Sequence, residues 1–251
     1  EIKKRYGVNA HLVPVPESAS PIDRLDRVAL TAARMLTNFF FAGMTMGVAW
    51  GSTTAAVSRN LASRQLRDSR VVQLNGAGNT FTTGMSYSGE ILRRFGEAYG
   101  ATVEQFPVPA FFDDPSAKET LWRERSTKRI LDIQSTMDVA LFGLGSNDSE
   151  VPSHVYTAGY LSVDDQKALN EGGVVGDIAT VFYRADGSSD CIALNNRSTG
   201  PSLDVIRKVP RKICVVAGAS RLPSLRGALA GQYVSDLIID DGTAAALLEQ
   251  A

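Results

Sequence analysis

The sequence predicts an α/β fold with a mostly parallel sheet that is covered by helices on both faces. Short apolar runs alternate along the chain with segments whose apolar residues recur every three or four positions, the pattern of strands followed by amphipathic helices. The runs are apolar over their whole length, which is typical of strands in a parallel sheet buried on both faces. Strands are expected at residues 44–50, 71–74, 102–108, 138–145, 212–217 and 237–239.

The helices are expected between these strands, and a further helix is expected at the C-terminus. The first helix has a clear start, because Ser20 can cap it and Pro21 occupies its first position. Its apolar positions continue at helical spacing to Phe40. The other helices are expected at residues 54–66, 88–99, 116–136 and 223–230.

The 251 residues are enough for one large domain or two small ones. Residues 1–20 show little periodicity and contain prolines, so we expect a linker there and one domain over residues 21–251. The run at residues 178–183 interrupts the alternation and is expected to be an inserted strand. We therefore also expect a small subdomain or lid within residues 107–185.

Composition and charge exclude several classes of protein. A net charge of −1 does not fit a domain that holds DNA by itself, and the one tight basic run is Lys3-Lys4-Arg5. Cys191 and Cys214 lie in separate apolar runs, where we expect two buried thiols, and the two histidines are scattered, so no metal site is expected. No apolar run is long enough to span a membrane and no signal peptide is visible, so we expect a cytoplasmic protein without a membrane partner.

The first strand-to-helix turn has the character of an anion site. Gly51, Ser52, Thr53 and Thr54 follow the strand at residues 44–50. Glycine lets the backbone approach an anion, while amides and hydroxyls at a helix start can donate to it. The turn lacks the lysine of a Walker loop. The alternative is that Ser52 or Thr53 only caps the helix.

Four other strand ends carry polar or glycine-rich turns. Asn75 and Gly76 open one turn, and Gly145 lies in the turn formed by residues 143–147. Neither completes the dinucleotide motif, and each alone is typical of a tight turn. Asp177 offers a carboxylate to sugar hydroxyls. Arg221, which we expect to be half exposed and unpaired, offers a planar fork to phosphate or carboxylate. Because ligands bind beyond the carboxyl ends of parallel strands, we expect these turns to form one site.

Catalytic patterns are missing from the sequence. There is no G-x-S-x-G elbow, no serine, histidine and aspartate in a plausible order, and no carboxylate pair with evident acid and base roles. No catalytic residue and no cofactor is therefore expected.

The ordered set of motifs resembles the sugar-binding domain of SorC-family transcription regulators, which are often grouped with a DeoR-like repressor. The resemblance covers residues 7–250. It is carried by Gly47-Val48-Ala49-Trp50-Gly51-Ser52-Thr53, Phe106-Pro107-Val108-Pro109-Ala110, residues 138–145, Gly176-Asp177-Ile178, Val215-Val216-Ala217-Gly218 and residues 237–244.

This resemblance implies a fold related to that of ribose-5-phosphate isomerase, glucosamine-6-phosphate deaminase and CoA transferases. It also implies a helix-turn-helix domain upstream of this chain that binds operator DNA, assembly into homodimers or homotetramers, and a sugar phosphate or polyol phosphate as effector. The family's phosphate loop falls on residues 51–54 and its acidic sugar contact on Asp177. Arg221 stands near the place of a family lysine. Some relatives form a Schiff base through a pocket lysine, but Asn75 occupies the corresponding turn, so non-covalent binding is expected.

Three functions are consistent with the sequence. The first is a ligand-sensing module that changes subunit arrangement when an effector binds, and the alternative is a sugar-phosphate isomerase or deaminase that uses Asp177 as general base. A purely structural oligomerisation domain is the third, and it leaves the polar strand ends unexplained.

Overall fold

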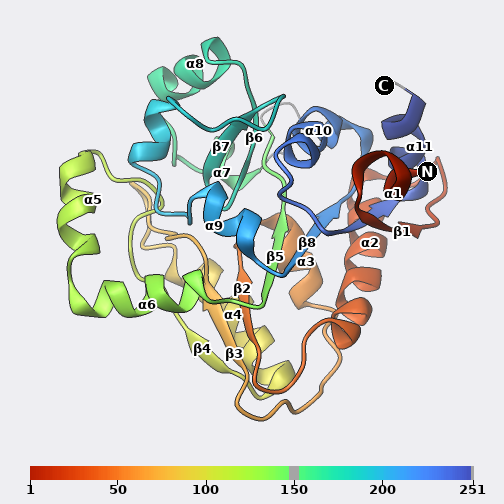
Figure 1. The fold of residues 1–251 in the computed structure, drawn as a ribbon, viewed down its shortest axis with the longest axis horizontal. Helices are drawn as coiled ribbons and strands as arrows, with labels where there is room; N and C mark the ends of the chain where they lie inside the picture. Colours follow the sequence, from red (N-terminus) through yellow and green to blue (C-terminus); the bar gives the residue numbers. More distant parts are fainter. Residues whose placement is uncertain (147–152, 250–251) are drawn as a thin grey trace.

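The computed structural model describes residues 1–146 and 153–249, and within them a seven-stranded sheet forms the centre of the molecule (Figure 1). Its strands lie in the order β1-β9-β8-β5-β2-β3-β4, and every neighbouring pair is parallel. The prediction of a mostly parallel α/β sheet is therefore confirmed. The strands are β1 (Asn9–Val13), β2 (Thr45–Val48), β3 (Arg70–Gln73), β4 (Thr102–Glu104), β5 (Val139–Gly143), β8 (Arg211–Val216) and β9 (Asp236–Asp240).

Helices cover both faces because alternate strand residues point to opposite sides. Along β8, Ile213 and Val215 belong to one apolar core, while Cys214 and Val216 belong to the other. The first core includes residues of α2 (Pro21–Met35), α3 (Ser52–Ser58) and α4 (Met85–Tyr99). The second includes residues of α9 (Leu203–Lys208), α10 (Leu222–Ala230) and α11 (Asp241–Glu249), and α6 (Arg125–Ser135) packs nearby against β3.

The expected insertion is a small second sheet beside the main one. It consists of the antiparallel hairpin β6 (Val174–Ile178) and β7 (Val181–Arg184), with α7 (His154–Thr157) and α8 (Val163–Glu171) beside it. Figure 1 shows these elements beyond the carboxyl end of β5, and an isolated bridge joins Gly145 to Asp177. Residues 107–185 are not one unit, however, because β5 is a central strand of the main sheet.

Several expected boundaries are wrong. The supposed linker at residues 1–20 contains helix α1 (Ile2–Tyr6) and strand β1, which pairs with β9 along the sheet edge. An edge strand needs no continuous apolar run, so its sequence gave a weak signal. The helix expected at residues 116–136 is divided into α5 (Pro115–Trp122) and α6. Helix α3 ends at Ser58, and β4 ends at Glu104.

The start of α2 agrees with its sequence. Ser20 is the N-cap, its side chain accepts a hydrogen bond from the amide of Asp23, and Pro21 is the first helical residue. Among the described residues, no helix is both long and apolar enough to cross a bilayer.

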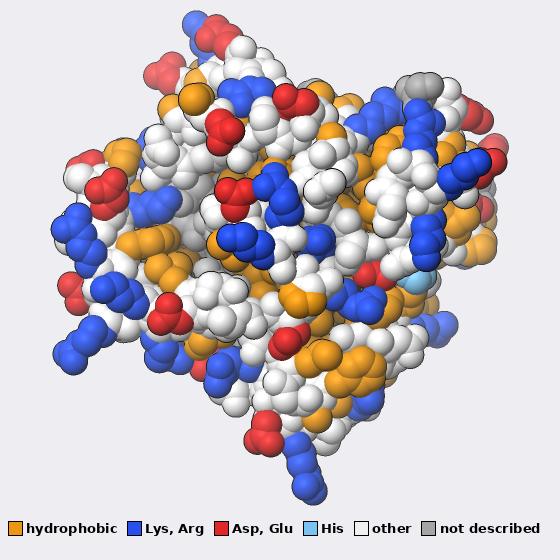
Figure 2. Space-filling model, viewed as in Figure 1, with side chains coloured by type: hydrophobic (Ala, Val, Ile, Leu, Met, Phe, Trp, Pro, Cys, Tyr) orange, Lys and Arg blue, Asp and Glu red, His pale blue; other side chains and the backbone are white. Residues whose placement is uncertain are grey.

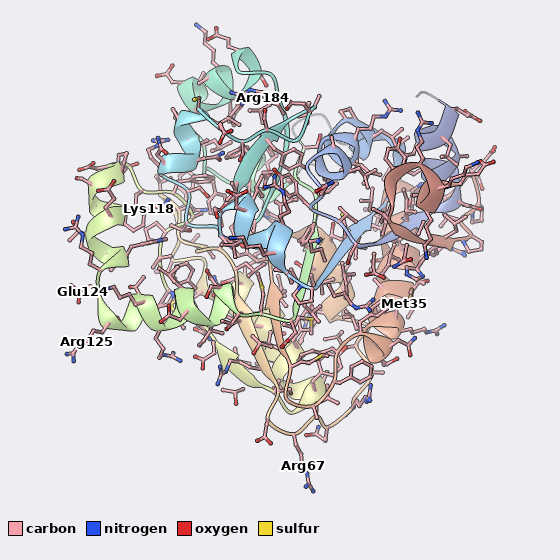
Figure 3. The ribbon with its side chains drawn as sticks, in the orientation of Figure 1. Met35, Arg67, Lys118, Glu124, Arg125 and Arg184 are labelled. Atoms are coloured by element: carbon pink, nitrogen blue, oxygen red, sulfur yellow. The ribbon has the colours of Figure 1, made fainter. Side chains whose placement is uncertain are left out.

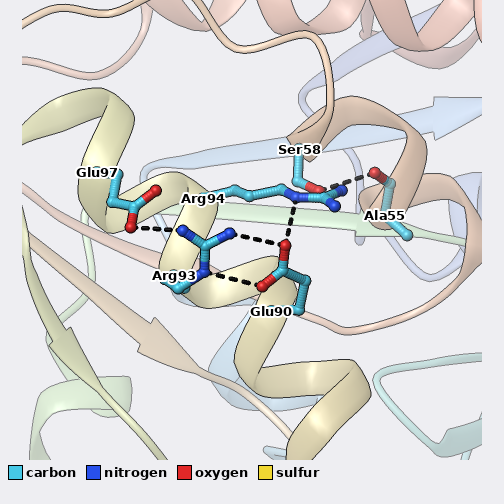
Figure 4. A network of polar contacts seen from close by, with 6 residues as sticks. All are labelled: Ala55, Ser58, Glu90, Arg93, Arg94 and Glu97. Carbon is cyan, nitrogen blue, oxygen red and sulfur yellow. Dashed lines mark hydrogen bonds and ion pairs between the residues drawn. The ribbon is translucent and has the colours of Figure 1, made fainter.

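Charged side chains of both signs are interspersed over the face drawn in Figure 2. Figure 3 shows Lys118 on α5, Glu124 just before α6 and Arg125 at its start, at the periphery of the molecule and away from the central sheet. Figure 4 shows Glu90 of α4 accepting hydrogen bonds from Arg93 and Arg94, with Arg94 reaching toward the C-terminal end of α3. These exposed pairs add little stability individually.

Candidate functional site

The candidate site lies where the strand order of the sheet reverses. The chain proceeds from β2 outward to β3 and β4, and then returns to place β5 on the other side of β2. The turns after β2 and β5 therefore diverge and leave a crevice at the carboxyl ends of the strands, the usual ligand position in such sheets. A pocket of about 460 Å³, which includes space open to solvent, occupies this crevice.

The structure brings eight of the nine predicted site residues together around this pocket. They are Gly51, Ser52, Thr53, Thr54, Asn75, Gly145, Asp177 and Arg221. Gly76 lies behind the wall: its amide donates to Thr199 Oγ1 at 3.0 Å and its carbonyl accepts from the Trp50 indole at 2.8 Å. A Cβ at position 76 would lie 2.3 Å from the carbonyl oxygens of Val108 and Pro109, so this glycine permits close packing of two loops. Asn147, the last residue of the turn after β5, is outside the described residues.

In the turn after β2, one hydroxyl stabilises the turn and two others line the pocket. Thr54 is buried, and its Oγ1 donates to the carbonyl of Ala49 at 2.7 Å, which secures the turn. Ser52 and Thr53 are partly exposed at the start of α3, and no hydrogen bond from their hydroxyls to a described residue is found. Position 51 has an extended backbone, and a Cβ there would meet open space. The open side of this turn thus presents two hydroxyls toward the pocket.

Asp177 brings a buried carboxyl to the opposite wall. Its Oδ2 accepts a hydrogen bond from the Thr180 amide at 3.1 Å, while Oδ1 has no hydrogen-bond partner among the described residues. Only glycine fits at position 145, because a Cβ there would lie 1.6 Å from that Oδ1. Burial raises the pKa of Asp177 to about 6, against the lowering effects of the Thr180 amide, the Arg221 guanidinium and the Tyr156 hydroxyl. The carboxyl therefore titrates close to neutral pH.

Arg221 is buried, which corrects our expectation of a half-exposed and unpaired side chain. It is 7% exposed, and its Nη1 donates to the carbonyl of Leu144 at 2.7 Å and to Ser153 Oγ at 2.9 Å. Burial lowers the pKa of its guanidinium, and the charge of Asp177 opposes that shift. The expectation failed because the short 3-10 helix η3 (Ala219–Arg221) turns the side chain inward beneath the turn after β5. Arg221 therefore supports the pocket wall as well as lining it.

Asn75 adds a second unsatisfied acceptor. It is 1% exposed, and its Oδ1 has no hydrogen-bond partner among the described residues. The neighbouring Trp50 also lines the pocket and donates its indole N–H to the Asn75 carbonyl at 3.0 Å. Because an unpaired buried polar atom is costly, two of them facing one pocket indicate a ligand that supplies the missing partners.

The sequence is similar to those of known sugar-binding regulators, which identifies its family. Residues 1–249 match the family model "Putative sugar-binding domain". A deoxyribonucleoside regulator of Bacillus subtilis (strain 168) is 32% identical over 250 residues, which cover 98% of this chain and 78% of that protein. This chain belongs to the sugar-binding domain family of SorC- and DeoR-like transcription regulators.

Solved structures agree with this membership. A domain of a possible sugar-binding transcriptional regulator from Arthrobacter aurescens TC1 is 55% identical, with a TM-score of 0.93 and coverage of 98% of this chain and 94% of that one. The full-length sorbitol operon regulator SorC from Klebsiella pneumoniae is 22% identical, with a TM-score of 0.88 and coverage of 99% and 79%; at this identity the likeness concerns the fold. These relatives confirm the expected family and regulatory role over the enzyme alternative.

The sugar-binding domain also places residues in the pocket that the sequence did not indicate: Ser153, His154, Ala179 and Thr180. Ala179 and Thr180 form the two-residue turn of the β6–β7 hairpin with positive φ angles of 48° and 67°. Asparagine and glycine normally signal such a turn, so this one has no sequence signal. Backbone conformations of this kind concentrate at functional sites.

The structure describes possible metal ligands within residues 1–146 and 153–249. Among the described residues, no three histidine, cysteine, aspartate or glutamate side chains are grouped as metal ligands would be. Cys214 is buried as expected, but Cys191 is exposed, because it lies in a turn with a positive φ of 58° and not in a strand.

Proposed function

We propose that this domain binds a sugar phosphate or polyol phosphate non-covalently in the pocket at the ends of β2 and β5. Its occupancy then controls how the intact regulator binds its operator. The observation that carries the proposal is the pairing of unsatisfied buried acceptors with a cation in one small pocket. Asp177 Oδ1 and Asn75 Oδ1 can accept hydrogen bonds from sugar hydroxyls, while Arg221 and the hydroxyls of Ser52 and Thr53 can donate to phosphate.

The residue types in the pocket support non-covalent binding. A Schiff base requires a lysine amine, and the described lining residues include none. Asn75 stands in the turn that corresponds to the pocket lysine of some relatives, and its amide can only form hydrogen bonds. The buried Arg221 is likewise no nucleophile.

The remaining parts of the regulatory proposal come from the family resemblance. We assign operator recognition to a helix-turn-helix domain that precedes this domain. We further propose that the regulator is cytoplasmic and assembles into homodimers or homotetramers. The effector would then act by favouring one subunit arrangement over another. The mixed charges on the face in Figure 2 are compatible with a domain that does not itself track DNA phosphates.

The test is a thermal-shift screen with matched pairs of ligands. Pentose, hexose and polyol phosphates are compared with the corresponding free sugars, and 2-deoxyribose 5-phosphate is included because one relative is named a deoxyribonucleoside regulator. A matching phosphate at about 100 times its Kd should stabilise the domain by about 2.7 kcal/mol, and its free sugar by much less. Stabilisation by free sugars alone would overturn the phosphate assignment, and steady turnover of any phosphate would restore the enzyme alternative.

A gel-shift experiment tests the division of labour. The domain by itself should show no sequence-selective DNA binding at physiological salt, because it has no assigned reading helix and is nearly neutral. Tight and selective binding by these residues would contradict the assignment of operator recognition to a separate domain.

A further inference from the structure

A second pocket adjoins the first and has a different chemical character. It also has a volume of about 460 Å³ with space open to solvent, and it shares Ser52, Thr53, Leu144 and Arg221 with the first pocket. Its other walls come from the first turn of α2 and from the loop that follows β8. These walls are formed by Pro21, Arg24, Leu25, Val215, Val216, Ala217, Gly218 and Ser220.

The charged groups lining this second pocket are both arginines. Arg24 is 16% exposed at its side chain, and its Nη1 donates to Asp240 Oδ1 at 2.7 Å. Its Nε and Nη2 form no hydrogen bond with the described residues, so part of the guanidinium fork is available to the pocket. No aspartate or glutamate is found among the described lining residues. The first pocket, by contrast, contains Asp177.

Asp240 holds Arg24 in place from behind. Its carboxyl is fully buried and also accepts hydrogen bonds from the Gly218 amide at 2.9 Å and from the Thr243 hydroxyl at 2.8 Å. Burial would raise the pKa of Asp240, but these hydrogen bonds outweigh burial and lower it, so the carboxylate is ionised at neutral pH. Asp240 therefore fixes the position of Arg24 through Nη1 alone, and the other two nitrogens of the guanidinium group are left for a ligand.

We propose that Arg24 is a phosphate-binding residue and that the phosphate of the effector lies in the second pocket. This inference rests on the proposed function, and it specifies which end of the ligand lies in which pocket. The phosphate would contact Arg24, Ser52 and Thr53, and the hydroxylated end would extend past Arg221 toward Asp177 and Asn75. The fitting class is a phosphomonoester with its phosphate at one end of the molecule.

Electrostatics favours this direction over the reverse. A phosphomonoester carries between one and two negative charges near neutral pH. Beside Asp177 it would meet a buried carboxylate of the same sign once that group ionises, and like charges in a poorly solvated site repel strongly. In the second pocket the same phosphate meets two guanidinium groups, and the planar fork of arginine suits bidentate contact with phosphate oxygens.

The test uses inorganic phosphate as the probe, because it reports on the anion subsite without any sugar contact. Binding is followed at constant ionic strength by melting temperature and by fluorescence in a Trp122→Phe background. The single remaining tryptophan is then Trp50, which lines the adjoining first pocket. Arg24→Gln should weaken phosphate binding at least tenfold, and Arg24→Lys less, since it keeps the charge but loses the fork. Arg27→Gln is the matched control, because Arg27 is exposed on the same helix and does not line the pocket.

Two further variants complete the test. Ser52→Ala, which leaves the Arg24–Asp240 pair intact, should also weaken phosphate binding. Arg24→Lys replaces Arg24→Gln as the test of Arg24 if that variant fails to fold. Asp177→Asn should retain phosphate binding while losing stabilisation by sugar phosphates. Equal phosphate affinity in Arg24→Gln and Arg27→Gln, or no phosphate response in the unmodified protein, would overturn the role of Arg24. If sugar phosphates still stabilise the protein in that case, the proposed function stands and only the assignment of Arg24 fails.

Discussion

The two pockets on either side of Arg221 differ in charge although they share a wall. On one side, Arg24 and Arg221 line the pocket with the hydroxyls of Ser52 and Thr53. On the other, Asp177 and Asn75 present acceptors that lack partners among the described residues. A crevice with two such ends suits a small molecule that carries an anion at one end and hydroxyls at the other, as we propose. It also means that a substitution should affect one end before the other.

The largest expected effect comes from adding one methyl group to the acidic side. In Gly145→Ala the new Cβ would lie 1.6 Å from Asp177 Oδ1, and the carboxyl cannot withdraw without breaking its contact with the Thr180 amide. Overpacking typically costs about 1–3 kcal/mol, and we expect the upper end of that range together with loss of sugar-phosphate binding. Chemical denaturation and calorimetric titration measure both.

Gly89→Ala is the control for this change. Gly89 lies within helix α4, and the nearest atom to a Cβ there is 4.0 Å away. Alanine in a helix is favoured over glycine by about 0.5–1 kcal/mol, so this variant should be slightly more stable. Equal stability of the two variants would show that position 145 is not tightly packed against Asp177.

The next effect tests the wall that both pockets share. Arg221→Met removes the donor to the Leu144 carbonyl and to Ser153 Oγ. Buried groups left without partners cost about 1–3 kcal/mol, so the protein should be less stable without ligand. Sugar-phosphate affinity should fall more than tenfold, because the cation that faces both ends of the ligand is gone.

Arg125→Met is the matched control for Arg221→Met, because Arg125 is exposed at the periphery of the molecule (Figure 3). It should change neither stability nor affinity. If Arg221→Met lowered the melting temperature and left affinity unchanged, Arg221 would be a structural residue only.

A smaller effect on stability, with a distinctive pH dependence, is expected from Asp177→Asn. The pKa of Asp177 is raised from 3.8 to about 6 in the folded protein, so the folded state binds a proton that the unfolded chain has lost. The protonated carboxyl stabilises the fold fully below pH 4, and this contribution is lost as the pH rises through 6. The shift corresponds to about 3 kcal/mol at most. Asparagine stays neutral, so the variant should gain stability over the native protein between pH 4 and 7.

The net gain should be smaller than that limit, about 1–2 kcal/mol, because asparagine removes the carboxylate nearest to Arg221. Unfolding free energies of both proteins across this pH range measure it. A difference that does not change with pH would mean that Asp177 titrates as an ordinary aspartate. In the native protein, sugar-phosphate affinity should rise through pH 6, as the carboxylate becomes the stronger acceptor.

The sequence predicted the sheet and most of the first pocket because those features depend on local pattern. Alternating apolar runs placed the strands, and strand-end turns placed Gly51, Asn75 and Gly145. Asp177 was likewise indicated by a strand-end turn, and the family motifs gave it the same role. These predictions depend on neighbouring residues in the sequence and not on the direction in which a side chain points in the fold.

The second pocket could not be predicted in this way. Arg24 lies in a helix whose pattern indicated only an apolar face, and its position depends on Asp240, 216 residues away along the chain. The inward turn of Arg221 likewise depends on the carbonyl of Leu144, and strand β1 depends on pairing with β9. Contacts between distant segments leave no periodic signal in the residues that make them.

The smallest expected effect isolates one hydroxyl that borders both pockets. Thr53→Val keeps the branched shape of the side chain, which packs where a Cβ at Gly143 would come within 2.8 Å, and removes only the hydroxyl. Since that hydroxyl has no hydrogen bond to a described residue, stability without ligand should change by less than about 0.5 kcal/mol. A lost hydrogen bond to phosphate should lower affinity about tenfold.

Thr54→Val is the contrasting neighbour, because the Thr54 hydroxyl donates to the Ala49 carbonyl inside the turn. It should lower stability by about 1 kcal/mol. Calorimetric titration and melting of the two variants separate the roles, and a Thr53→Val protein that binds phosphate normally would remove this hydroxyl from the anion subsite.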